Sequence, residues 1–182
     1  MATDTPTFES VLTDEILALV GTEGAPCTHE VTRPGVRAFA RATRYTDRIY
    51  FDVEEAKRQG YRDLPAPPGH LGFPVFDPEK TDPIMSWPFD PNSRINHPFS
   101  PAQYVHTELL AGSLDLEYID SDICAGDVLV SRTKLEDIRE RYSKGLDGPM
   151  VIQTTATTFK RADKPVAIYR FTLIGFTPVE GT

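Results

Sequence analysis

Four long runs rich in Val, Ile, Thr, Tyr and Phe fill the C-terminal half of the chain, and they restrict the fold more than any other feature. The first run alternates apolar and polar side chains with a period of two, which is typical of a strand with one buried face. The runs span roughly residues 113–118, 128–141, 149–160 and 165–176. They predict an antiparallel meander. Exposure of its last strand, Val166 to Phe176, at an edge would risk pairing with another chain, so we expect oligomerisation.

Helical patterns precede these strands. Residues 8–20 place apolar side chains at helical spacing and end at Gly21, which predicts a first helix. A short alternating piece follows, and Pro34 then opens a second helical pattern with an apolar face. The opposite face of this second helix carries three basic residues, Arg37, Arg41 and Arg44. These arginines either bind a phosphate group of a ligand or form a basic face beside an acidic partner surface.

A third, short helix has clear signals at both ends. Asp52 is a good N-cap, Glu55 stands at the capping-box spacing, and Gly60 supplies a stop, so residues 53–59 are predicted to be helical. Helices followed by a run of antiparallel strands predict the α+β class.

The middle of the chain, residues 61–106, is predicted to be a long Pro-rich loop. The chain holds 16 prolines, and most of them fall between Pro65 and Pro101, where they exclude a regular helix or a central strand. Loops of this length inside a domain are usually functional or covered by a partner. We expect residues 1–182 to form a single domain, with residues 1–27 as an N-terminal helical extension.

Charge and composition exclude several classes of partner. The net charge of −8 disfavours binding to nucleic acid or to an anionic membrane. Cys27 and Cys124 lack the spacing of a disulfide framework or a zinc site, so no metal or other cofactor is expected. Residues 1–7 lack a signal-peptide pattern and no apolar run is long enough to span a bilayer, which predicts a cytoplasmic protein.

Two segments resemble the MaoC-like hydratase/dehydratase family, in its N-terminal or FAS1-like dehydratase-half variant. They are Val36 to Pro68, VRAFARATRYTDRIYFDVEEAKRQGYRDLPAPP, and Leu114 to Leu129, which ends in CAGDVL. The resemblance implies a hot-dog fold, a long antiparallel sheet wrapped around a central helix. It also implies an acyl thioester of coenzyme A or acyl carrier protein as substrate, in fatty acid or polyketide metabolism, with reversible hydration of its 2,3-double bond.

The same resemblance implies that the catalytic motif of this chain is degenerate. Catalytic members carry Asp-x-Asn-Pro-(Ile or Leu)-His, followed by x-Asp-x-x-x-Ala. Asp52 and Ala56 match the second part, but Tyr45 stands where the catalytic Asp belongs and Tyr50 where the His belongs. A tyrosine, with an ordinary pKa of about 10, is a poor general base at neutral pH. Asp47, at the Asn position, is either a lone base or a helix cap.

Family members also polarise the thioester carbonyl with a backbone N–H at the start of the central helix. The resemblance places this start at Pro67 and Pro68, which have no N–H, and at Gly69 and His70, which have one. The candidate substrate-binding residues are therefore Tyr45, Tyr50, Pro67, Gly69 and His70. The candidates for a replacement base are Asp47, His70, His97 and His106.

Three functions remain open from the sequence. The first is a subunit of an (R)-specific enoyl-CoA hydratase or 3-hydroxyacyl-thioester dehydratase that shapes the acyl tunnel while a partner supplies the Asp/His dyad. Two fused hot-dog halves need roughly 250 residues, so we expect that partner on another polypeptide, in a dimer or larger oligomer. The second is a self-sufficient homo-oligomeric lyase or thioesterase with a non-standard base. The third is a binding module for acyl thioesters or other hydrophobic ligands without catalysis.

Overall fold

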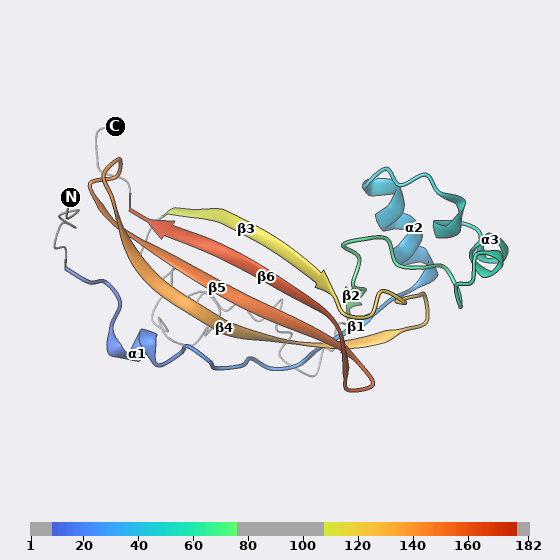
Figure 1. Cartoon of the computed structure of the whole chain (residues 1–182), viewed down its shortest axis with the longest axis horizontal. Helices are drawn as coiled ribbons and strands as arrows, with labels where there is room; N and C mark the ends of the chain where they lie inside the picture. Colours follow the sequence, from blue (N-terminus) through green and yellow to red (C-terminus); the bar gives the residue numbers. More distant parts are fainter. Residues whose placement is uncertain (1–8, 76–107, 178–182) are drawn as a thin grey trace.

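The computed structural model describes residues 9–75 and 108–177, and its dominant feature is one curled six-stranded antiparallel sheet (Figure 1). The strand order is β2-β1-β4-β5-β6-β3. The bounds are β1 Cys27–Glu30, β2 Phe73–Pro74, β3 Glu108–Tyr118, β4 Val128–Ser143, β5 Gly148–Arg161 and β6 Lys164–Phe176. The four predicted strands of the C-terminal half are confirmed, with the first of them beginning earlier than its sequence pattern suggests.

The last strand lies inside the sheet. The strands β4, β5 and β6 form the predicted meander, but β3 pairs with β6 from Glu108 opposite Phe176 to Tyr118 opposite Ala167. The strand β6 is therefore covered on both sides, and β3 and β2 lie at the two edges of the sheet in the described residues. The side chains agree with this arrangement, because Asp115 and Glu117 give β3 the charges that edge strands usually carry.

The helices gather mainly at one end of the sheet (Figure 1). They are α1 Asp14–Leu17, α2 Arg33–Ala42, the 3-10 helix η1 Arg48–Tyr50, and α3 Val53–Arg58. The second and third predicted helices are thus confirmed. In α3, one carboxylate oxygen of Asp52 accepts hydrogen bonds from the backbone N–H groups of Glu54 and Glu55, at 3.0 and 3.2 Å. The Glu55 side chain bonds to Arg58 and Gln59, so only half of the capping box forms.

The first predicted helix is much shorter than residues 8–20. The backbone N–H groups of Val11 and Leu12 donate to the Glu140 carboxylate on β4, at 2.6 and 3.2 Å. These tertiary bonds replace a first helical turn and hold the segment along the sheet. The short helix α1 that follows buries Ile16 against Ile138 of β4 and Val151 of β5.

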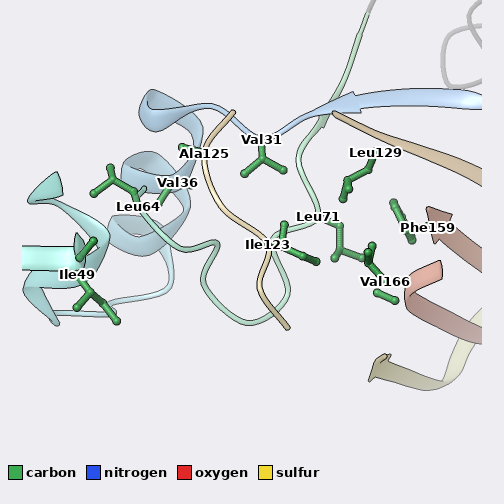
Figure 2. Packing of buried hydrophobic residues seen from close by; sticks show 12 residues of the cluster. Val31, Val36, Ile49, Leu64, Leu71, Ile123, Ala125, Leu129, Phe159 and Val166 are labelled. Carbon is green, nitrogen blue, oxygen red and sulfur yellow. The ribbon is translucent and has the colours of Figure 1, made fainter. Parts of the chain in front are cut away.

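A core of buried apolar residues joins the helical end to the sheet (Figure 2). Val36 of α2 and Leu64 of the segment after α3 are fully buried in it. Leu129 and Phe159 contribute from the sheet, and Ile123 from the β3–β4 connection. Close packing of this kind fixes the helical end relative to β4, β5 and β6, so the residues around α2 have a defined position.

A buried carboxylate reinforces this junction. Asp127, in the predicted turn before β4, is 7% exposed and accepts hydrogen bonds from Arg62, from Arg161 and from the backbone N–H of Cys124. Burial alone would raise the pKa of Asp127, but the hydrogen bonds from Arg62, Cys124 and Arg161 outweigh it and hold that pKa below its usual value. The ionised carboxylate therefore ties three separate segments together.

The central helix does not begin at Pro67 to His70. The His70 N–H donates to the Pro67 carbonyl in a turn, at 2.9 Å, and Gly69 and Gly72 have φ values of 92° and 83°, which an α-helix does not accommodate. The chain then pairs with β1 as the short strand β2. The remainder of the predicted Pro-rich loop lies outside the described residues.

Candidate functional site

The two tyrosines at the expected dyad positions lie next to each other. Tyr45 follows the end of α2 and Tyr50 ends η1, and their ring centroids are 5.6 Å apart. Burial is the main cause that raises the pKa of Tyr50. Electrostatic interactions with the nearby Tyr45, Asp47 and Tyr61 raise it further. The Tyr50 phenol therefore keeps its proton at neutral pH. The pair can present aromatic surface and hydroxyl groups to a ligand, but the raised pKa of Tyr50 leaves even less phenolate to act as a base at neutral pH than a free tyrosine has.

Asp47 acts as the N-cap of η1. One of its carboxylate oxygens accepts a hydrogen bond from the backbone N–H of Ile49, at 3.1 Å. The carboxylate is already used to satisfy a helix terminus, as short polar side chains at such positions commonly are.

The His70 side chain is enclosed by aromatic rings. It is 2% exposed, and its ring centroid lies 5.0 Å from that of Phe39 and 5.2 Å from that of Phe73. Its Nε2 atom has no hydrogen-bond partner among the residues that the structure describes. Burial lowers the pKa of His70, so the neutral imidazole is favoured. In this position the ring packs against Phe39 and Phe73 and is almost entirely shielded from water.

Both backbone N–H groups that the resemblance offers for the thioester carbonyl already have acceptors. The Gly69 N–H donates to the Tyr118 hydroxyl, at 2.8 Å, and the His70 N–H donates to the Pro67 carbonyl. Burial raises the pKa of Tyr118 in spite of the opposing effect of the Gly69 bond, so the acceptor is a neutral phenol. Tyr118 must move before a substrate carbonyl can take its place.

Contacts through Phe39 and Tyr118 link several of the candidate residues. Phe39 of α2 contacts the His70 ring and lies 3.4 Å from the position that a Cβ on Gly69 would occupy. Tyr45 lies close enough to Tyr118 for the two phenols to interact electrostatically. His97 and His106 lie outside the described residues.

Beside the tyrosine pair is an open hollow of about 600 Å³, lined by Arg41, Arg44, Tyr45, Thr46 and Phe51. Arg41 and Arg44 are two of the three basic residues noted on the second helical pattern. The third, Arg37, donates to the Phe51 carbonyl, at 3.1 Å, and so has a structural role.

One polar pair was not found from the sequence. His29 of β1 and Ser131 of β4 form a buried hydrogen bond of 2.8 Å between Nε2 and Oγ. Burial lowers the pKa of His29, whose ring lies 5.1 Å from that of Phe159. The two residues are 102 positions apart, so only the pairing of β1 with β4 brings them together. Because both are buried, the pair is placed to stabilise the sheet and has little access to water.

Within residues 9–75 and 108–177, no cluster of three or more His, Cys, Asp or Glu side chains is arranged to hold a metal ion. In the same part of the chain, no helix has the length and apolar character needed to cross a membrane.

The curled sheet and the remnant motif at its helical end define a hot-dog fold of the dehydratase type. The sequence matches the family described as FAS1-like, dehydratase domain region, over residues 18–169, and the chain belongs to that family. The resemblance to MaoC-like dehydratases and the predicted fold class are thereby confirmed. No curated protein matches the chain.

Solved structures of similar fold include two complexes from Mycobacterium tuberculosis. A chain of the ChsH1-ChsH2 complex has a TM-score of 0.65 at 19% identity, with 92% of each chain covered. A chain of the HadBC (3R-hydroxyacyl-ACP dehydratase) complex has a TM-score of 0.58 at 21% identity, covering 86% of this chain and 97% of that one. A MaoC-like dehydratase matches at 23% identity and a TM-score of 0.61, covering 89% of this chain but only 43% of that longer chain. At these identities the likeness concerns the fold.

Proposed function

We propose that this chain is the tunnel-shaping subunit of an (R)-specific enoyl-thioester hydratase or 3-hydroxyacyl-thioester dehydratase, and that a second hot-dog subunit supplies the catalytic Asp/His dyad. The proposed substrate is an acyl thioester of coenzyme A or acyl carrier protein. The proposed location is the cytoplasm, and the proposed role is in fatty acid or polyketide metabolism.

The observation that carries this proposal is the chemistry of the two dyad positions. Hydration of a 2,3-double bond needs a group that takes a proton from water and returns one to the acyl chain. The family motif, counted along this sequence, puts Tyr45 and Tyr50 where those groups are expected, and burial raises the pKa of the Tyr50 phenol. The other two described candidates are occupied otherwise, since Asp47 caps η1 and His70 is enclosed by Phe39 and Phe73.

The backbone donors that the family motif offers for the thioester carbonyl are not free in the described residues. An oxyanion donor must point a free N–H at the developing charge. The Gly69 N–H instead donates to Tyr118, and Pro67 has none. What this chain retains is the sheet, the aromatic surface near Tyr45 and the family scaffold, which suit binding of an acyl chain better than proton transfer.

The edge strand β3 supports the presence of a partner subunit. Within the described residues β3 has only β6 as a neighbour, so its other side presents unpaired backbone groups. Leu110 and Leu114 of this strand are 55% and 60% exposed, and Leu109 is also exposed. Although Asp115 and Glu117 add charge to this strand, exposed leucine side chains beside an unpaired strand favour cover by a second subunit. Two of the similar folds come from complexes named for two subunits, ChsH1-ChsH2 and HadBC.

The proposal is tested by mutating the chain within the reconstituted enzyme. The chain is combined with the hot-dog subunit that co-purifies with it, and hydration of 2-enoyl-CoA is measured with Asp47→Asn and His70→Gln variants of this chain. The expected kcat stays within about 3-fold of the wild-type complex, because a true general acid or base contributes at least ~100-fold. Mutation of the partner's dyad should abolish turnover.

A loss of roughly 100-fold or more with either variant of this chain, at an unchanged melting temperature, would contradict the proposal. It would favour a self-sufficient enzyme that uses a non-standard base. Asp47→Asn keeps the size of the side chain and an oxygen that can accept the Ile49 N–H bond. His70→Gln replaces a buried ring, so for this variant the unchanged melting temperature is what separates an effect on chemistry from an effect on packing.

A further inference from the structure

A hollow on the sheet lies apart from the candidate site. Side chains alternate between the two faces of the sheet, and one face carries the core residues Leu129, Ile138, Val151 and Phe159. The opposite face, here called the outer face, carries this hollow across β4, β5 and β6, with a volume of about 590 Å³. It is lined chiefly by strand residues, with Glu23 of the N-terminal segment and the β5–β6 turn at its margins.

The strand register places small side chains at the centre of the hollow and long basic side chains on either side of them. Ala156 of β5 lies directly between Lys134 of β4 and Arg170 of β6. Two residues further along β5, towards the β5–β6 turn, Thr158 points to the same face and lies opposite Arg132 of β4. Small side chains on the central strand flanked by long ones on its neighbours leave an open space between the cationic groups.

Three of the four cations around this space have no carboxylate partner in the described part of the chain. No ion pair forms there at Arg132, Lys134 or Lys160, although Arg132 donates to the Gly24 carbonyl, at 3.2 Å. Arg170 pairs with Glu117 and Glu136, at 3.3 Å each. Three carboxylates also line the hollow, Glu23, Glu136 and Asp163. A chain with a net charge of −8 thus gathers four cations on one concave part of its sheet.

We propose that this hollow binds a small molecule that carries two or more phosphate groups. The cations stand on adjacent strands about 4.8 Å apart, so the backbones of Lys134 and Arg170 are separated by about 10 Å. A single phosphate contacts only part of such an array, whereas a diphosphate or a nucleotide reaches several of its members. A concave site of several hundred Å³ suits a small ligand, while a protein surface would need a larger and flatter area.

The carboxylates at the margin restrict the kind of ligand. Glu23 and Asp163 disfavour a ligand whose whole surface is anionic, but they can accept hydrogen bonds from ribose hydroxyls or an adenine amino group. The arrangement therefore fits a nucleotide, with its phosphates among the four cations and its ribose or base near Glu23 or Asp163. This inference concerns a different face of the molecule from the proposed acyl-binding function and does not depend on it.

The test is calorimetric titration of the full chain with inorganic pyrophosphate, ADP and coenzyme A in low salt. The expected result is saturable binding of ADP at one site, which a Lys134→Gln/Lys160→Gln double variant weakens by at least about 10-fold, since each charge-assisted contact contributes a factor of that order. Comparing the affinities of coenzyme A and ADP distinguishes a general nucleotide site from a site for the carrier of the acyl thioester. Tighter binding of coenzyme A than of ADP, lost in the same variant, would assign the hollow to the carrier's phosphates.

Arg141→Gln is the matched control, because Arg141 lies further along β4 opposite Met150 and outside the hollow. It removes a charge from the same strand and should leave ADP binding within about 2-fold. Absence of saturable binding for all three ligands, or equal weakening by Arg141→Gln and the double variant at unchanged melting temperatures, would overturn the proposal.

Discussion

Replacing Asp127 with Ala should destabilise the junction between the sheet and the helical end more than any exposed charge does. The substitution leaves the backbone N–H of Cys124 and the guanidinium groups of Arg62 and Arg161 without their shared acceptor. Truncating one partner of a fully buried ion pair costs about 3–5 kcal/mol. Arg62 is half exposed and Arg161 about a quarter exposed, so water compensates both in part, and we expect a loss of about 2–3 kcal/mol.

Urea denaturation followed by circular dichroism measures this loss. With an m-value of about 2 kcal/mol/M, the midpoint should fall by about 1–1.5 M. Asp122→Ala is the matched control, because Asp122 also pairs with Arg62 but is half exposed, and its loss should cost less than about 1 kcal/mol. If Asp127→Ala destabilised the protein no more than Asp122→Ala, the reasoning that burial makes this carboxylate important would be refuted.

Two further predictions concern the buried histidines and Tyr118. Burial lowers the pKa of His29 and of His70 in the folded protein, so the unfolded chain takes up protons first as the pH falls below about 6.5. Stability should therefore be constant above that pH and decline below it towards the folded-state pKa values, and an unchanged urea midpoint between pH 7.5 and 5.5 would speak against this. Tyr118→Phe removes the acceptor of the Gly69 N–H and should lower the free energy of unfolding by about 1 kcal/mol, measured in urea at pH 7.5. No change in stability would indicate that water satisfies this N–H equally well.

Local patterns in the sequence were sufficient to predict most elements. The alternation before Tyr118 marked a strand, and the signals at Asp52 and Gly60 bounded α3 almost to the residue. These signals depend on side-chain periodicity and on hydrogen bonds between near neighbours, so a single sequence contains them.

Features that depend on long-range pairing were missed or misplaced. The position of β3 beside β6 follows from pairing between distant segments, and no local pattern distinguishes it from pairing with β4. The shortened first helix has the same kind of cause, because Glu140 lies about 130 residues away from the backbone groups that it binds.

The candidate site shows the same division. The two tyrosines at the dyad positions were identified by counting along the motif, and the structure places their rings side by side. The occupation of the Gly69 N–H by Tyr118 and the aromatic enclosure of His70 were not predictable, since both arise from tertiary contacts.

The central claim is that this chain contributes shape and not proton transfer, and the rate of 2-enoyl-CoA hydration by the purified chain alone tests it most directly. The account predicts no turnover above the uncatalysed rate, with activity appearing only when a dyad-bearing subunit is added. Sustained hydration by the isolated chain, at a kcat in the usual enzyme range of about 1 s⁻¹ or higher, would contradict it.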